Sequence, residues 1–145
     1  DYSAFPNRPY WVAGEKPLLE LPLTTIYRGL LARKGTALFP RLAKVPHGAG
    51  IAARAGLLER IALTPEGTPL RDAIHAVDTA LDDGLPLLVL SFHSPSLAPG
   101  NTPYVHDERE LDALYDWLRG IYAHMASRNV SPTTVKQVWD AAQQA

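Results

Sequence analysis

A strand–helix–strand pattern between residues 60 and 92 constrains the fold more than any other feature of the sequence. Arg60–Leu63 is predicted to be a short strand, and the apolar run Leu87–Phe92 a second, buried one. Between them, apolar residues recur at helical spacing from Leu70 to Leu81. Strands joined by a helix in roughly 30 residues normally lie parallel. The sequence therefore predicts an α/β protein with parallel strands alternating with helices.

Helix-terminus signals support this organisation. Thr68 is predicted to be the N-cap of the helix between the two strands, with Pro69 as its first residue and Gly84 as the residue that ends it. Asp107 is predicted to be the N-cap of the longest helix, because Glu110 follows at the capping-box spacing. A broad apolar face along that helix is typical of core packing.

The remaining segments are shorter and are broken by proline or glycine. Leu18–Leu23 is predicted to be an edge strand because Pro22 cannot donate a ladder hydrogen bond. Three short helical pieces are predicted over Ile26–Arg33, Ala37–Lys44 and Ile51–Leu58, and a last helix should begin at Ser131-Pro132.

Composition excludes several classes of protein. The 145 residues fit one domain over 1–145, and the net charge of −1 argues against nucleic acid or an anionic membrane surface as the main partner. No apolar run approaches the roughly 20 residues that a membrane span needs. The absence of cysteine excludes disulfides and thiolate zinc sites. Asp1–Pro17 shows no periodicity, so it is either an extended lead-in or the point at which a longer chain was cut.

His93 is the main candidate for chemistry because it ends the predicted strand Leu87–Phe92. Ligands of α/β proteins bind just past the carboxyl ends of strands, and a partly desolvated imidazole there suits general acid–base catalysis. The alternative is a buried histidine that only bonds the following loop. Glu20 lies in an apolar strand, where it would either orient His93 or point to solvent. No Gly-x-Ser-x-Gly motif and no histidine pair at metal-binding spacing is present.

The segment around His93 also resembles a known family. Leu88–Leu97 and the following Pro99–Val105 are similar to the last catalytic segment of polysaccharide deacetylases of the NodB-homology type, in particular the WalW-like branch found among bacterial exopolysaccharide proteins. Pro9–Trp11, Leu18–Thr25 and Gly56–Gly67 resemble upstream regions of the same branch. The resemblance covers nearly the whole chain.

The resemblance implies a distorted (β/α) barrel and a metal-dependent hydrolase that removes N- or O-acetyl groups from a carbohydrate substrate. The aspartate and histidine pairs that bind the family's divalent, zinc-like metal would precede Asp1, so this chain would be the C-terminal portion of the catalytic domain. No metal ligand is expected within it. By itself it should be inactive, and it could associate with itself through exposed barrel edges. The compartment, bacterial cytoplasm or cell envelope, stays open.

Roles of individual residues follow from the same resemblance. His93 would be the general acid toward the leaving group, and Leu90 the apolar wall of the same motif. Ser94 and Tyr104 would contact the substrate. Glu20 would take the role of the carboxylate of the family's fourth motif, although the local pattern departs from it. The alternative to this whole interpretation is a complete small α/β module that binds a ligand or a protein partner without catalysis.

Overall fold

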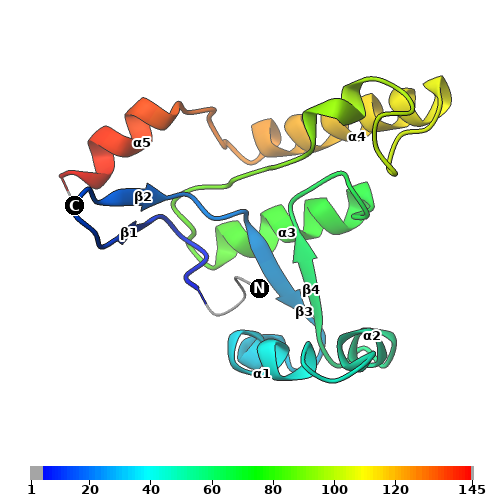
Figure 1. The fold of residues 1–145 in the computed structure, drawn as a ribbon, viewed down its shortest axis with the longest axis horizontal. Helices are drawn as coiled ribbons and strands as arrows, with labels where there is room; N and C mark the ends of the chain where they lie inside the picture. Colours follow the sequence, from blue (N-terminus) through cyan, green and yellow to red (C-terminus); the bar gives the residue numbers. More distant parts are fainter. Residues whose placement is uncertain (1–4, 145) are drawn as a thin grey trace.

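The computed structural model describes residues 5–144 and shows a mixed α/β arrangement (Figure 1). Helix α3 lies at the centre, with the β3–β4 pair on one side and the long helix α4 on the other; α1 and α2 cover the far end of β3 and β4. The elements are β1 (Tyr10–Val12), β2 (Leu18–Glu20), β3 (Thr25–Arg28), a 3₁₀ turn η1 (Ala32–Lys34), α1 (Gly35–Leu42), α2 (Gly48–Arg54), β4 (Glu59–Ala62), α3 (Leu70–Asp82), a second 3₁₀ turn η2 (Ser94–Leu97), α4 (Glu108–Ser127) and α5 (Val135–Ala142).

Both sheets in the described residues are two-stranded and antiparallel. Parallel strands were predicted for Arg60–Leu63 and Leu87–Phe92, and only the first of these two segments contains a regular strand. Strand β1 pairs with β2, and β3 pairs with β4 so that Ile26 lies opposite Ile61 and Tyr27 opposite Arg60. The predicted helix over Ile26–Arg33 is also wrong at its start, because β-branched and aromatic residues pair there with a strand far along the chain. The predicted strand at Leu18–Leu23 is confirmed in its first half.

Segment 87–92, the predicted buried strand, forms no regular strand although it runs beside the ends of β3 and β4. Thr24 donates its backbone N–H to the Val89 carbonyl at 3.0 Å, while its hydroxyl accepts the Val89 N–H at 2.8 Å. The Thr24 carbonyl accepts the Leu63 N–H, and the Leu63 carbonyl accepts that of Ser91. The Thr24 hydroxyl thus takes the place of a backbone carbonyl as acceptor, which interrupts the regular backbone hydrogen-bond ladder between Thr24 and segment 87–92. Thr24 itself is almost fully buried.

The core lies on the two faces of α3. Ala73 and Val77 pack with Leu63 and with residues of α4, whereas Ala76 and Ala80 pack against the isoleucines of the β3–β4 sheet. Small alanines allow both neighbours to approach the helix backbone closely. The predicted amphipathic helix is confirmed, and its apolar surface extends around two faces instead of one.

The start of α3 differs from the prediction by one residue. Pro69, not Thr68, occupies the N-cap position. The Thr68 hydroxyl donates instead to the Ala62 carbonyl at 3.1 Å, and the Thr68 carbonyl accepts the indole N–H of Trp117 at 2.9 Å. Thr68 therefore ties β4 and α4 together and does not cap the helix. Gly84 ends α3 as predicted, with φ +68°.

The predicted N-terminus of α4 is confirmed, because the Asp107 carboxylate accepts the Glu110 N–H at 2.8 Å. Helix α5 begins later than predicted, since Thr134, not Ser131, is its N-cap and forms a capping box with Gln137. Helices α1 and α2 match the predicted pieces Ala37–Lys44 and Ile51–Leu58 with shifted boundaries.

Of the unpatterned segment Asp1–Pro17, residues 1–4 lie outside the described residues and the rest contains β1. No helix within residues 5–144 has both the length and the apolar character needed to cross a membrane.

Candidate functional site

His93 lies where segment 87–92 ends, as the residue that precedes the 3₁₀ turn η2. Its side chain is 68% exposed, so the expectation of a partly desolvated histidine is wrong. The turn forms because Ser96 donates its N–H back to the His93 carbonyl at 2.9 Å, with Pro95 near its start. The imidazole is therefore presented to solvent at the start of a rigid turn.

Glu66 is the carboxylate partner of His93. Its Oε2 lies 2.5 Å from His93 Nδ1, and its Oε1 accepts the His93 backbone N–H at 2.9 Å. The side chain of Glu66 is only 7% exposed. It belongs to the turn that follows β4, where the Thr64 hydroxyl accepts the Glu66 N–H at 3.2 Å. The ends of β4 and of segment 87–92 therefore bring a buried acid and an exposed imidazole together.

A chain of hydroxyl groups continues behind Glu66. The fully buried Ser96 hydroxyl donates a hydrogen bond to Glu66 Oε1 at 2.9 Å. Its single proton is then used, so it accepts the hydrogen bond that joins it to the Thr102 hydroxyl, 3.0 Å away. Thr102 in turn accepts the N–H of Tyr104 at 3.4 Å. The Tyr104 ring stacks on the His93 ring with centroids 5.9 Å apart. The 94–105 loop thus orients both the acid and the imidazole.

These contacts settle the charge of Glu66. Burial alone would raise the pKa of Glu66, but hydrogen bonds from the His93 backbone, the His93 ring and the Ser96 hydroxyl outweigh burial, and the pKa lies below its ordinary value of 4.5. Glu66 is therefore an anion at neutral pH. An ionised carboxylate can only accept, so the proton of a neutral His93 ring lies on Nδ1. Nε2 is left to exchange a proton with a bound molecule.

Of the four residues expected near His93, the structure brings only some together. Tyr104 stacks on His93, and Ser94 is the exposed first residue of η2. Leu90 packs against the core formed by α3 and α4. Glu20 is exposed on β2 opposite Tyr10 and makes no hydrogen bond or ion pair with His93 within the described part of the chain. Glu66, and not Glu20, is therefore the carboxylate that contacts His93.

Sequence reasoning missed Glu66, which lies in the short connection between the predicted strand Arg60–Leu63 and the predicted N-cap Thr68. One signal was available: Glu66 follows a strand end, as His93 does, and strand ends that meet at one edge bring such side chains together. A second His–Glu contact shows why the signal is weak. His106 donates its N–H to Glu110 and places Nδ1 2.9 Å from it, yet that pair is local and exposed at a helix start.

Residues 5–144 contain no group of three or more His, Asp or Glu side chains arranged to hold a metal ion. His93 Nδ1 is already bonded to Glu66, and the other contacts of that cluster are hydroxyls and ring faces. A single imidazole with hydroxyls and ring faces is a poor donor set for a divalent metal, whereas an exposed imidazole held by a carboxylate can take part in proton transfer. Comparison of the chain with protein-family models, curated protein sequences and solved structures returned no significant match.

Proposed function

We propose that this chain supplies the proton-transfer side of a carbohydrate deacetylase site, in a protein that hydrolyses N- or O-acetyl groups. The chain would then be the C-terminal portion of a barrel-type catalytic domain, as the residues around His93 suggest by resemblance. The observation that carries the proposal is the buried Glu66 carboxylate on Nδ1 of an exposed histidine. Acid–base catalysis needs such an orienting partner.

Each residue of the cluster has a defined part in this proposal. Glu66 holds the Nδ1–H and stabilises the positive charge of the imidazolium. Protonated His93 donates from Nε2 to the sugar nitrogen or oxygen as the acetyl group leaves, and afterwards recovers a proton from water. Tyr104, stacked on His93, offers an aromatic surface beside which a sugar ring can lie. Leu90 takes no direct part because it packs in the core.

A divalent metal in such enzymes activates the water that attacks the acetyl carbonyl. Residues 5–144 do not provide its ligands, so no step of the proposal passes through a metal held by this chain.

The test is acetate release from an N-acetylated and an O-acetylated oligosaccharide by the natural protein that carries this chain, with zinc present. His93→Gln should lower kcat about 100-fold or more, because a general acid contributes that much. His75→Gln, on the exposed side of α3, is the matched control and should leave kcat unchanged. Equal kcat values for the wild type and His93→Gln would overturn the proposal.

A binding module without catalysis is the second candidate, and a large apolar groove favours it. The groove measures about 1140 Å³ and lies between the β1–β2 hairpin, segment 85–90, the end of α4 and α5. Trp11, which lines the groove, contacts Trp139 of α5 edge to face, with ring centroids 5.0 Å apart. The two-stranded sheets, by contrast, leave strand edges available for self-association, as a partial barrel would. Light scattering after size-exclusion chromatography separates the candidates, because a monomer favours the binding module and self-association favours the partial barrel.

A further inference from the structure

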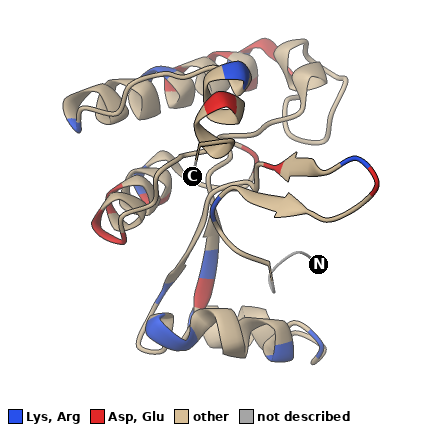
Figure 2. Ribbon diagram, turned by 90° about the vertical axis from the view of Figure 1, so that its left-hand side faces the viewer, with Lys and Arg blue, Asp and Glu red and all other residues tan. Residues whose placement is uncertain are grey.

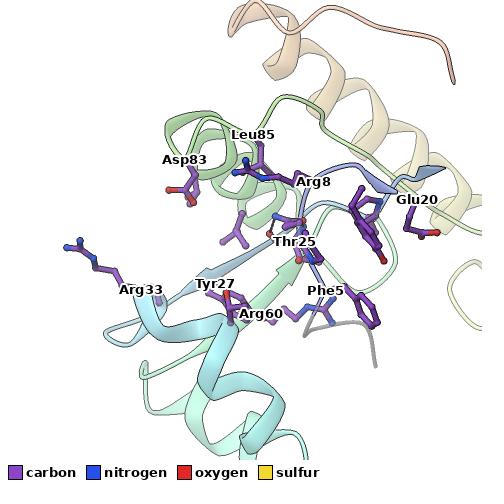
Figure 3. Close-up of a pocket in the computed structure, with 18 residues that line it drawn as sticks. Phe5, Arg8, Glu20, Thr25, Tyr27, Arg33, Arg60, Asp83 and Leu85 are labelled. Atoms are coloured by element: carbon purple, nitrogen blue, oxygen red, sulfur yellow. Dashed lines mark hydrogen bonds between the residues drawn. The ribbon is translucent and has the colours of Figure 1, made fainter. Parts of the chain in front are cut away.

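A second cavity, of about 890 Å³, shares no residue with the His93 cluster (Figure 3). It lies between the N-terminal segment 5–10, the start of β3, η1 and the end of α3. Three of its lining residues are arginines, namely Arg8, Arg33 and Arg60, and two are carboxylates, Glu20 and Asp83. Positive charge therefore exceeds negative charge along its wall.

Arg60 is the unusual residue of this cavity. It extends from β4 in the direction of Phe5 (Figure 3), and its Nε is buried without a hydrogen-bond partner. None of its other N–H groups bonds an acceptor within residues 5–144, and no carboxylate there pairs with it. A guanidinium carries five donors and stays charged at any relevant pH. Arg60 thus brings an unneutralised cation into a partly enclosed space.

The neighbouring Arg28 shows that this fold can neutralise an arginine in the same sheet. Arg28 donates from Nε and Nη2 to Glu59 and from Nη1 to Asp72, at distances between 2.6 and 3.1 Å. Arg60, one residue further along β4 than Glu59, has no such acid among residues 5–144. The lack of an acidic partner is therefore particular to Arg60 and is not shared by Arg28 in the same sheet.

The surroundings of Arg60 hold it in place without cancelling its charge. The Phe39 ring lies 5.9 Å from the Arg60 guanidinium carbon, and Tyr27 is its cross-strand partner. Burial raises the pKa of the Tyr27 phenol, and the charge of Arg60 offsets only part of that effect. Tyr27 therefore stays neutral. An anion that reaches Arg60 would find a cation positioned beside the Phe39 ring.

The electrostatic field of the residues around the cavity also favours the approach of an anion. The segment 29–58, which includes η1, α1 and α2, contains no aspartate or glutamate. Its positively charged residues lie at one end of the chain's fold, in blue at the bottom of the ribbon in Figure 2. They are Arg33, Lys34, Arg41, Lys44 and Arg54. Arg33 also lines the cavity, so this basic end is continuous with it.

We infer that this cavity binds a small molecule in which a carboxylate or a phosphate monoester is attached to a ring. The oxyanion accepts hydrogen bonds from Arg60, whose forked guanidinium matches carboxylate and phosphate geometry. The ring packs on the aromatic wall, where Phe5 and Tyr10 stack with centroids 6.0 Å apart. Occupation of this site is independent of the acid–base chemistry at His93.

Calorimetric titration of the 145-residue chain with benzoate, glucose 6-phosphate, inorganic phosphate and neutral glucose tests the inference. At least one ring-bearing anion should bind more tightly than inorganic phosphate, and glucose should not bind. Arg60→Gln should weaken that binding at least about tenfold, since it removes a charge-assisted bidentate contact. Arg54→Gln removes a charge of the same basic end outside the cavity and should change affinity less than about twofold.

Several outcomes would overturn the inference. One is the absence of saturable binding of every anion up to about 10 mM. Another is an equal loss of affinity in Arg60→Gln and Arg54→Gln, which would indicate only a diffuse basic surface. Equal affinity for inorganic phosphate and both ring-bearing anions would overturn the role of the aromatic wall. If circular dichroism shows that Arg60→Gln is unfolded, the affinity of Arg60→Lys in the same titration replaces it as the test. Arg60→Lys keeps the charge but loses the fork, so an unchanged affinity would contradict the proposed contact.

Discussion

Replacing Glu66 by alanine removes the acceptor of three hydrogen bonds. The donors are the Ser96 hydroxyl, the His93 ring and the His93 backbone N–H, and they differ greatly in burial. Ser96 is fully buried, so its hydroxyl would lose a charged acceptor that water cannot easily replace. A hydrogen bond to a charged group contributes about 1.5–3 kcal/mol. The His93 side chain is mostly exposed, so its two bonds to Glu66 add only about 0.5–1 kcal/mol together. We expect Glu66→Ala to lower the free energy of unfolding by about 2–4 kcal/mol.

Urea denaturation at pH 7 and at pH 3 measures this loss and its pH dependence. The pKa of Glu66 is lowered on folding, so its stabilising effect is present above the ordinary value of 4.5 and is lost as pH falls through the lowered value. The difference between wild type and Glu66→Ala should therefore shrink at pH 3. Glu110→Ala is the matched control, because Glu110 makes the same two contacts with His106 at an exposed site and should cost less.

Two results would refute the reasoning about Glu66. Equal unfolding free energies for Glu66→Ala and Glu110→Ala would show that the burial of Ser96 does not matter. A loss in Glu66→Ala that is the same at pH 3 and pH 7 would show that the ionised carboxylate is not what stabilises the loop.

The backbone supplies two further predictions and the proposed function supplies a third. Gly29→Ala should lower the free energy of unfolding by about 1–3 kcal/mol, because φ is +109° and an added Cβ would meet the Leu57 carbonyl at 2.6 Å. Gly50→Ala, in α2 with open space around it, should raise the unfolding free energy by about 0.5–1 kcal/mol in the same urea titration. The 145 residues alone, supplied with zinc, should release no acetate from an acetylated oligosaccharide; release proportional to the concentration of the chain would contradict the proposed division of the active site.

The features that the sequence predicted well are those decided by neighbouring residues. The cap at Asp107, the stop at Gly84 and the apolar faces of α3 each depend on side chains within about one or two helical turns. Strand β4 was also predicted, since its pattern is short and bounded by turn residues.

Features decided by distant segments were predicted poorly. Thr25–Arg28 becomes a strand only because β4, more than 30 residues later, pairs with it. The same holds for the site, where His93 was identified but Glu20 was the only carboxylate considered as its partner, with exposure to solvent as the alternative. The Glu66 contact spans 27 residues and depends on how the loop after η2 folds back. The pattern of neighbouring residues in the sequence does not show which side chains from distant segments come into contact.

The contacts of Thr24 have a consequence for how the site assembles. One residue bonds both Val89, 65 positions away, and Leu63, so the two chain segments that end at His93 and Glu66 are joined through it. Contacts of such long sequence separation close large loops, which slows folding. Together with the direct hydrogen bond from Ser91 to Leu63, Thr24 makes the His93–Glu66 contact depend on the packing of three separate chain segments.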